Sequence, residues 1–378
     1  MPTTGGAAYI GPMTMTPTST SFAVTERPER RSAEEIAQLL ESPGFGNLFT
    51  EHMALIDWDR EQGWHDPRVV PYGPIQLDPS AAVFHYAQEI FEGMKAYRHA
   101  DGSIWTFRPE RNAERFNASA RRLAMPELPP TMFLDAIKEV VTVDQGWVPS
   151  ADSGETSLYL RPFMIATEEA LGVRPSNRYL FSVICSPAGA YFSGGLKPVS
   201  LWVSEHYVRA AAGGTGAAKC GGNYASSLAS QAEGIEHGCD QVVFLDAQEH
   251  RYVEELGGMN LFFVYADGRV VTPELTGTIL PGVTRSSLIE LARERGLDVQ
   301  ERRFTIDEWR EGVASGEITE VFACGTAAVI TPVGRLAWNG GELEMAGGHE
   351  LTLSLRQELL DIQYGRAEDR HGWLYKLV

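Results

Sequence analysis

One lysine of this chain lies in a segment made almost entirely of small residues. Within residues 212–224, Lys219 is accompanied by five glycines and three alanines. Small neighbours let other groups approach the amine closely, and glycine adopts backbone angles that other residues avoid. An amine with the ordinary pKa of roughly 10.4 is protonated at neutral pH, so it becomes a nucleophile only when it is desolvated or held as a Schiff base. The segment predicts either a reactive lysine or an ordinary glycine-rich surface loop.

Two nucleotide-binding loops also use clustered glycines, and neither fits this segment. The Walker phosphate loop requires Gly directly before its lysine and Ser or Thr directly after it, where this chain has Ala218 and Cys220. The dinucleotide-binding pattern requires a third glycine after Gly214 and Gly216, at the position that Lys219 occupies. These mismatches exclude a P-loop NTPase and leave the lysine itself as the reactive group.

Length, composition and charge indicate a globular protein of two domains. The chain has 378 residues, of which 43% are hydrophobic and 22% charged, and this length exceeds what one core usually supports. The formal net charge of −18 argues against nucleic acid and anionic membranes as partners, so any anionic cofactor must be held by local donors. No apolar run approaches the length of a membrane span.

The cysteines and histidines predict no metal site. The four cysteines are scattered without a CxxC pair, and the nine histidines show no HExxH or comparable spacing. Such cysteine usage is typical of a reducing compartment, so we expect a cytoplasmic protein.

Shifts in composition divide the chain into four parts. Residues 1–30 are rich in Thr, Pro, Gly and Ser, which predicts a disordered or loosely docked arm. Residues 31–187 have the mixed pattern of a small α+β domain, and the proline and glycines near residue 190 predict a connector over 188–200. Residues 201–378 alternate between strand and helix patterns, as in a larger α/β domain.

The periodicity and capping signals place the main elements. We expect helices over residues 32–42, 131–143, 225–233 and 351–364, one from Thr284 as N-cap to residue 295, and one capped by Thr305. Strands are expected over residues 53–58, 157–162, 179–185 and 241–245, and a helix running into a strand over 84–98.

The lysine segment and several further motifs resemble one family. The string GGTGAAKCGGNYASSL resembles the lysine segment of the branched-chain amino-acid aminotransferases, fold-type IV enzymes that use pyridoxal 5′-phosphate (PLP). Further motifs of the same family occur in the family's order along the chain, two before the lysine segment and four after it. They are FEGMKAY, LYLRP, VEELGGMN, ILPGVTR, CGTAA and DIQYG. The resemblance covers roughly residues 44–378. It implies a small α+β domain and a larger α/β domain with PLP at their interface.

The resemblance assigns the cofactor-binding residues. Lys219 is implied as the catalytic Schiff-base lysine, Tyr224 as the partner of the cofactor's phenolic oxygen, and Glu255 as the partner of its pyridine nitrogen. A carboxylate there keeps the ring protonated and therefore able to accept electrons. Glu254 competes for this role but points the other way along a strand. The phosphate is assigned to Arg115, Val283, Thr284 and Thr326, while Arg108 and Arg111 are expected on the surface.

The resemblance also assigns the substrate pocket. Its aromatic walls are Phe45, Tyr86, Phe91, Tyr159 and Tyr191. Arg161 is implied to bind a carboxylate beside Tyr159, and the turn at Thr326 and Ala327 to bind the substrate's α-carboxylate. The loop at Val173 is implied to reach the active site of a neighbouring subunit, which requires a homodimer.

The activity implied is a ping-pong transamination. The amino group of L-leucine, L-isoleucine or L-valine passes to 2-oxoglutarate, in the last step of synthesis or the first of breakdown of these amino acids. A D-amino-acid transaminase and an aminodeoxychorismate lyase share the fold, the lysine and the glutamate, but FEGMKA, LYLRP and GGNYASSL match the branched-chain group. A binding protein that had lost catalysis would lack Lys219, Glu255 or Arg115, and all three are present.

Overall fold

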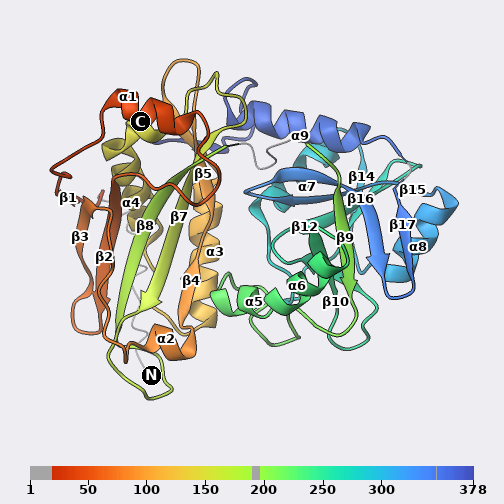
Figure 1. Cartoon of the computed structure of the whole chain (residues 1–378), viewed down its shortest axis with the longest axis horizontal. Coiled ribbons are helices and arrows are strands. Elements are labelled where there is room, and N and C mark those ends of the chain that lie inside the picture. The colour runs from red at the N-terminus through yellow and green to blue at the C-terminus, as the bar shows by residue number, and fades with distance from the viewer. Residues whose placement is uncertain (1–18, 190–195, 346) are drawn as a thin grey trace, which may run out of the picture.

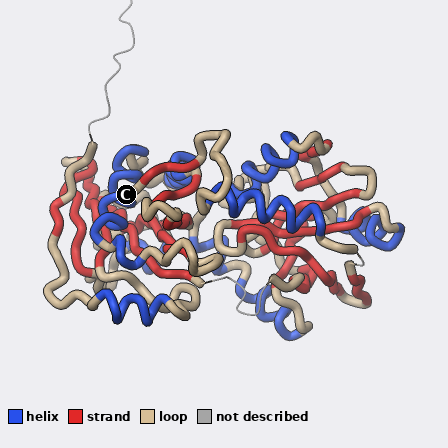
Figure 2. The backbone as a smooth tube through the Cα atoms, turned by 90° about the horizontal axis from the view of Figure 1, so that it is seen from above, coloured by secondary structure: helices blue, strands red, loops and turns tan. Residues whose placement is uncertain are grey.

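The fold is built on two nine-stranded sheets that lie side by side (Figures 1 and 2). The structure is a computed structural model that describes residues 19–189, 196–345 and 347–378. Most of the predicted arm, part of the predicted connector and Tyr191 lie outside the described residues. None of the helices in the described ranges is long and apolar enough to cross a membrane.

The first sheet belongs to the N-terminal half of the chain. Its order is β1-β3-β2-β8-β7-β5-β6-β18, and β4 pairs with β7. The strands are β1 (Ala23–Val24), β2 (His52–Asp59), β3 (Gly63–Pro71), β4 (Glu89–Phe91), β5 (Met94–Arg98), β6 (Ile104–Phe107), β7 (Ser157–Ala166), β8 (Arg178–Ala188) and β18 (Leu374–Lys376). The helices of this half are α1 (Ala33–Leu40), α2 (Ala82–Tyr86), α3 (Pro109–Arg122) and α4 (Pro130–Val143), followed by a 3-10 turn over Gln145–Trp147.

Strand β7 shows how this sheet separates core from site. Its residues alternate strictly between buried and half-buried after the first pair, as expected where successive side chains point to opposite faces. Leu158, Leu160 and Met164 enter the core formed with α3 and α4, where Phe116 and Phe133 are also buried. The alternate residues of β7 therefore face away from that core.

The second sheet belongs to the C-terminal half. Its order is β11-β10-β9-β16-β15-β12-β13-β14, and β17 pairs with β16. The strands are β9 (Val199–Ser204), β10 (Gln241–Leu245), β11 (Val253–Leu256), β12 (Asn260–Tyr265), β13 (Arg269–Thr272), β14 (Asp298–Glu301), β15 (Ile318–Gly325), β16 (Val329–Trp338) and β17 (Gly341–Glu344). The helices are α5 (Gly221–Ala225), α6 (Leu228–Glu236), α7 (Val283–Glu294), α8 (Ile306–Ser315) and α9 (Glu350–Gln363).

The chain end ties the two halves together. Strand β18 pairs antiparallel with β6 of the first sheet. The predicted domain boundary at residue 201 places this strand with the second domain instead. Helix α9 packs against β15 and β16 of the second sheet and also touches β6 of the first. The C-terminal segment therefore contacts both sheets.

Most predicted elements are present, with local corrections. The helix after the lysine loop is split into α5 and α6. Helix α7 begins at Val283 with Gly282 as its N-cap, so Thr284 lies inside the first turn and is not the cap. Arg108, predicted on the surface, is buried with φ 48° and donates from Nη1 to Ser287 Oγ at 2.8 Å. In the sequence, Arg108 looks like part of a solvent-exposed arginine cluster. Its burial becomes visible only in the structure, where it packs against α7.

Candidate active site

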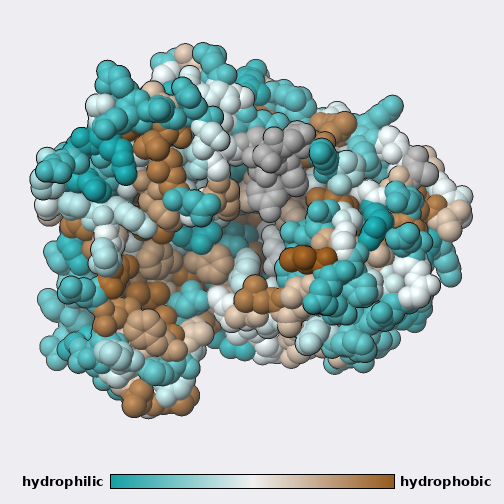
Figure 3. Space-filling model, viewed as in Figure 1, coloured by the Kyte–Doolittle hydropathy of each residue, from teal (hydrophilic) through white to brown (hydrophobic). Residues whose placement is uncertain are grey.

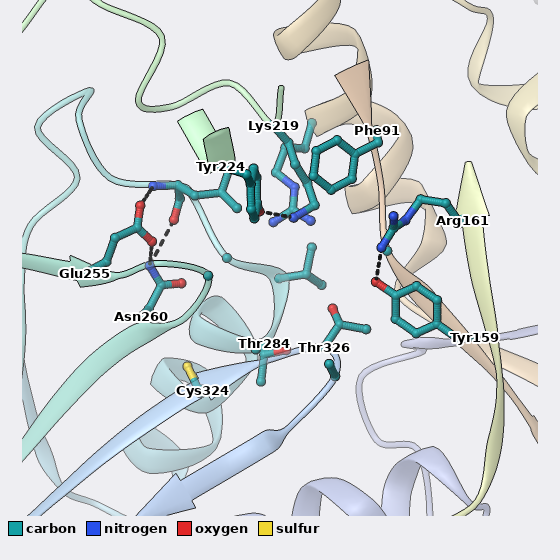
Figure 4. A pocket seen from close by; sticks show the side chains of 18 of the residues that line it. Phe91, Tyr159, Arg161, Lys219, Tyr224, Glu255, Asn260, Thr284, Cys324 and Thr326 are labelled. Carbon is teal, nitrogen blue, oxygen red and sulfur yellow. Dashed lines mark hydrogen bonds between the residues drawn. The ribbon is translucent and has the colours of Figure 1, made fainter. Parts of the chain in front are cut away.

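A cavity of about 220 Å³ contains most of the predicted site residues. Both halves of the chain contribute to its walls, and Figure 4 shows the labelled side chains facing it. The predicted residues that line it are Phe45, Phe91, Arg115, Tyr159, Arg161, Lys219, Tyr224, Glu255, Val283, Thr284, Thr326 and Ala327. Residues that lie up to 282 positions apart in the sequence, Phe45 and Ala327, thus meet in one site.

The amine of Lys219 is held at the junction of the two halves. The backbone N–H of Lys219 donates to Ser119 Oγ at 2.8 Å, and the backbone carbonyl of Lys219 accepts a hydrogen bond from the Phe91 N–H at 3.0 Å. The amine Nζ donates to Tyr224 Oη at 2.6 Å and lies 4.8 Å from the centre of the Phe91 ring. Burial, assisted by the nearby Arg115 charge, lowers the pKa of Lys219 to about 8. A useful fraction of the amine is therefore unprotonated near neutral pH.

The glycines of the lysine segment are required by close approach. A Cβ atom on Gly216 would overlap the carbonyl of Thr278, and one on Gly221 would overlap the carboxylate of Glu89. Gly213 has φ +77°, a conformation that side chains disfavour. The small residues around Lys219 thus let neighbouring segments pack directly against its backbone.

A buried ion pair forms one end of the cavity. Glu255 Oε1 lies 2.8 Å from Arg209 Nη1, and each side chain is only 2% exposed. The Leu280 N–H donates to Glu255 Oε1 at 2.8 Å, and Asn260 Nδ2 donates to Oε2 at 3.1 Å. Burial raises the pKa of Glu255 to about 7, against the opposing pull of Arg209. Arg209 carries no motif signal, but a buried carboxylate that must ionise needs such a partner.

The neighbouring glutamate lies on the other face of β11. Glu254 accepts a hydrogen bond from Thr278 Oγ1 at 2.5 Å and does not line the cavity. Of the two consecutive acids, only Glu255 therefore lines the cavity, as the alternation of a strand predicts.

A further part of the cavity wall is rich in donors. The guanidinium of Arg115 binds Glu92 through Nε to Oε1 and Nη2 to Oε2, both at 2.8 Å, and its Nη1 donates to the Pro281 carbonyl at 3.0 Å. Glu92 is fully buried; burial raises its pKa, but Arg115 outweighs that effect and holds the pKa below its ordinary value. Glu92 lies within the FEGMKAY motif, yet its partnership with Arg115 is visible only in three dimensions.

The first turn of α7 and the turn after β15 also line the cavity. Val283 and Thr284 open α7, where backbone N–H groups are unpaired and the helix dipole is positive. Gly282 precedes them, and a Cβ there would overlap Asn260 Oδ1. Thr326 lies in the turn between β15 and β16. Such a set of amides, hydroxyls and one arginine is suited to a phosphate.

Aromatic rings and one arginine line the side formed by the first sheet. Arg161 Nη2 donates to Tyr159 Oη at 3.2 Å, and the guanidinium carbon lies 4.9 Å from the centre of the Phe91 ring. The Phe45 ring meets Tyr159 edge-on at 5.1 Å. This wall combines apolar surface with a cation.

Lys95 does not line the cavity but supports one of its turns, a role that its place in the FEGMKAY motif did not indicate. Its Nζ donates to the Ala327 carbonyl at 2.9 Å and thereby fixes the turn that holds Thr326. Burial lowers the pKa of Lys95 to about 8, although the carboxylate of Glu155 raises it. Lys95 pairs in register with Tyr159, so it links the first sheet to that turn.

Two predicted pocket residues lie away from the cavity of their own chain. Tyr86 is 38% exposed and donates from its hydroxyl to the Leu171 carbonyl, and Val173 is 84% exposed. Neither lines the cavity. Tyr191 lies outside the described residues.

Comparisons with known proteins place this site in a family. Residues 89–336 match the family model described as amino-transferase class IV. A branched-chain-amino-acid aminotransferase of Mycolicibacterium smegmatis is 60% identical over 344 residues, which are 90% of this chain and 93% of that protein. One of Mycobacterium tuberculosis is 56% identical over 368 residues, 96% of this chain and 100% of that protein. The chain belongs to the class IV aminotransferases, in the branched-chain group.

A solved structure agrees with this assignment. The T.th. branched-chain amino acid aminotransferase with pyridoxamine 5′-phosphate is 30% identical, with a TM-score of 0.72, and the match covers 88% of this chain and 100% of that one. Other structures of that enzyme are complexed with N-(5′-phosphopyridoxyl)-L-glutamate and with 4-methylvaleric acid. The predicted family, fold type and cofactor PLP are thereby confirmed.

The donors of this aminotransferase fit PLP. In Figure 4, Lys219 and Tyr224 face Thr284 and Thr326 across the cavity, and Glu255 lies to one side. An amine for the aldehyde, a carboxylate for the ring nitrogen and a helix N-terminus for the phosphate are thus present together. Arg115, Val283, Thr284 and Thr326 would hold the phosphate, Glu255 the ring nitrogen and Lys219 the aldehyde carbon.

Substitution of Glu255 tests the raised pKa. Because burial raises the pKa from 4.5 to about 7, the folded cofactor-free aminotransferase binds this proton more tightly than the unfolded chain does. The resulting stabilisation is complete at low pH and is lost as the pH rises towards about 7, roughly 3 kcal/mol in total. We expect Glu255→Gln to remove this part of the pH dependence of unfolding free energy in urea. Exposed Glu114→Gln is the control, and identical pH profiles for Glu255→Gln and the unsubstituted protein would refute the assignment.

Proposed function

We propose that this aminotransferase transfers the amino group of L-leucine, L-isoleucine or L-valine to 2-oxoglutarate, giving branched 2-oxo acids and L-glutamate. The observation that carries the proposal is the meeting of Lys219, Glu255 and an aromatic wall containing Arg161 in one cavity. The relatives at 56% and 60% identity favour this activity over a D-amino-acid transaminase or an aminodeoxychorismate lyase. All four cysteines are free and buried, which supports a reducing, cytoplasmic location.

Lys219 has the position and protonation to act as acid and base. Bound PLP supplies an electron sink for the charge left when the substrate's α-proton is removed. Lys219 Nζ would accept that proton as general base and hold it for return as general acid. Burial, followed by the field of Glu255, raises the pKa of Tyr224 to about 12. Its hydroxyl therefore stays protonated, and it orients the Lys219 amine by accepting a hydrogen bond from Nζ at 2.6 Å.

The wall beside Arg161 accounts for two kinds of substrate. A branched side chain packs against the rings of Phe45, Phe91 and Tyr159, which exclude water from the reacting carbon. The side-chain carboxylate of 2-oxoglutarate or glutamate binds Arg161, since a guanidinium offers paired donors to a carboxylate. The turn at Thr326 and Ala327, held from behind by Lys95, binds the α-carboxylate.

Visible absorption of the holoenzyme tests the activity. We expect L-leucine to bleach the cofactor band and 2-oxoglutarate to restore it, because each half-reaction changes the bond between Lys219 and the cofactor. Lys219→Ala should lack the band and lose at least roughly 100-fold in rate. D-Leucine is the control. A response to D-leucine alone would instead assign the enzyme to the D-specific group.

We further propose that the enzyme is a homodimer in which each subunit completes its partner's site. Exposed apolar side chains gather on the first half, around α2 and the loop between β7 and β8 (Figure 3). They are Phe84 (61% exposed), Tyr86, Leu171 (64%) and Val173. A group of neighbouring exposed apolar side chains is typical of an interaction surface. The hydrogen bond from Tyr86 to the Leu171 carbonyl holds the cluster together.

Val173→Asp tests this surface. A charge at the centre of a buried interface is costly, so we expect the variant to sediment as a monomer and to lose roughly tenfold or more in kcat/KM. Leu353→Asp, on the exposed face of α9, is the matched control and should remain dimeric. A Val173→Asp protein that stays dimeric with unchanged kcat/KM would contradict the proposal.

A further inference from the structure

The first residue of β4 links the two halves beside the reactive lysine. Glu89 Oε1 accepts the Gly221 N–H at 2.6 Å, and two residues later the Phe91 N–H donates to the Lys219 carbonyl at 3.0 Å. The Glu89 carboxylate occupies the position that a Cβ on Gly221 would take, so a side chain there would displace the carboxylate. Strand β4 thus holds the lysine segment with one backbone and one side-chain contact.

Glu89 lies on the same face of the first sheet as Arg161. Strand β4 runs antiparallel to β7, with Glu89 opposite Ile165 and Phe91 opposite Phe163. Arg161, Phe163 and Ile165 are the half-buried residues of β7, which alternate with its buried ones. Glu89 and Arg161 therefore share the side of the sheet that faces the active site.

Arg161 has no ion pair in the part of the chain that the structure describes. Its Nε is buried without a hydrogen-bond partner, and its guanidinium lies over the rings of Phe91 and Tyr159. Glu89 is the carboxylate on which its field acts: burial raises the pKa of Glu89, and the Gly221 N–H and Arg161 lower it. The charges of Glu89 and Arg161 therefore interact, although the two side chains form no ion pair.

We propose that Glu89 is a specificity-determining residue whose charge lets Arg161 serve both substrate classes. Glu89 is ionised while a branched, apolar side chain is bound. It takes up one proton from solvent when a substrate's side-chain carboxylate binds Arg161, and it returns that proton when the dicarboxylate leaves. The inference rests on the proposed function, in which Arg161 receives that carboxylate.

The physical reason is the balance of buried charge. A guanidinium facing an apolar side chain needs a nearby negative charge to offset its burial. When a second carboxylate arrives, two like charges share one cation, and one of them becomes protonated. Glu89 is the one predisposed to do so, because burial already raises its pKa above the ordinary value.

Other charges near β4 are already committed. Helices α3 and α5 pack against β4. On α3, Arg115 is paired with Glu92, and Arg122 donates to the carbonyls of Gly213 and Gly214. On the lysine segment, the Lys219 amine binds Tyr224. Arg161 is thus the charged group that acts on Glu89.

Proton uptake on ligand binding tests the proposal on the holoenzyme. Glutarate and 4-methylvalerate are matched ligands of similar length, with and without a second carboxylate. Calorimetric titrations in two buffers of different ionisation enthalpy give the protons bound with each. At a pH above the pKa of Glu89, we expect glutarate to bring up to one proton more than 4-methylvalerate does.

Glu89→Gln isolates the charge, since its amide oxygen still accepts the Gly221 N–H. In this variant we expect the extra proton to vanish and the affinity ratio of glutarate to 4-methylvalerate to rise about tenfold, the effect of one pKa unit. Exposed Glu114→Gln is the control and should behave as the unsubstituted enzyme. An unchanged visible spectrum shows that the lysine segment is intact.

Two failures are distinguishable. If Arg161→Met weakens glutarate but Glu89→Gln leaves the extra proton and the affinity ratio unchanged, Glu89 has no such role and the proposed function stands. If Arg161→Met leaves glutarate binding unchanged, Arg161 does not receive the carboxylate, and both this inference and that part of the proposed function are wrong.

Discussion

The burial of charge is the constraint on which the rest of this structure depends. The cavity removes several ionisable side chains from water, and an unpaired buried charge is costly. Arg115 is therefore paired with Glu92, and Arg209 with Glu255. Lys219 has no such partner in the described residues and relies on the Tyr224 hydroxyl. Its amine consequently has a lowered pKa, which is the property that the chemistry needs.

The two halves divide this task between them. The first sheet supplies the rings and cation of the substrate wall through the alternation of β7. The second half supplies Lys219 and the lining residues from β11, the start of α7 and the turn after β15, while α3 of the first half adds Arg115. Contacts across the cleft, such as that from Lys95 to the Ala327 carbonyl, keep the two sets in register. Neither half forms the site alone.

The motifs predicted the family, the fold type and most residues around the cavity, because each motif is a local string whose chemistry is shared. They did not predict Arg209, Glu92 or Lys95 as partners, since these roles arise from contacts between distant segments. Arg108 was misplaced on the surface because a buried arginine and a solvated one look alike in sequence. The roles of Tyr86 and Val173 remain predictions that depend on a second subunit.

The proposed chemistry requires Lys219 to be the amine that binds PLP covalently. Lys95 is the main alternative amine for PLP attachment, because burial lowers its pKa to about 8 as well. Reduction of the holoenzyme with borohydride, followed by proteolysis and mass spectrometry, locates the attached phosphopyridoxyl group. We predict that it lies on the peptide containing Lys219 and is absent from Lys219→Ala. A label on Lys95, or one that persists in Lys219→Ala, would show that another amine binds the cofactor.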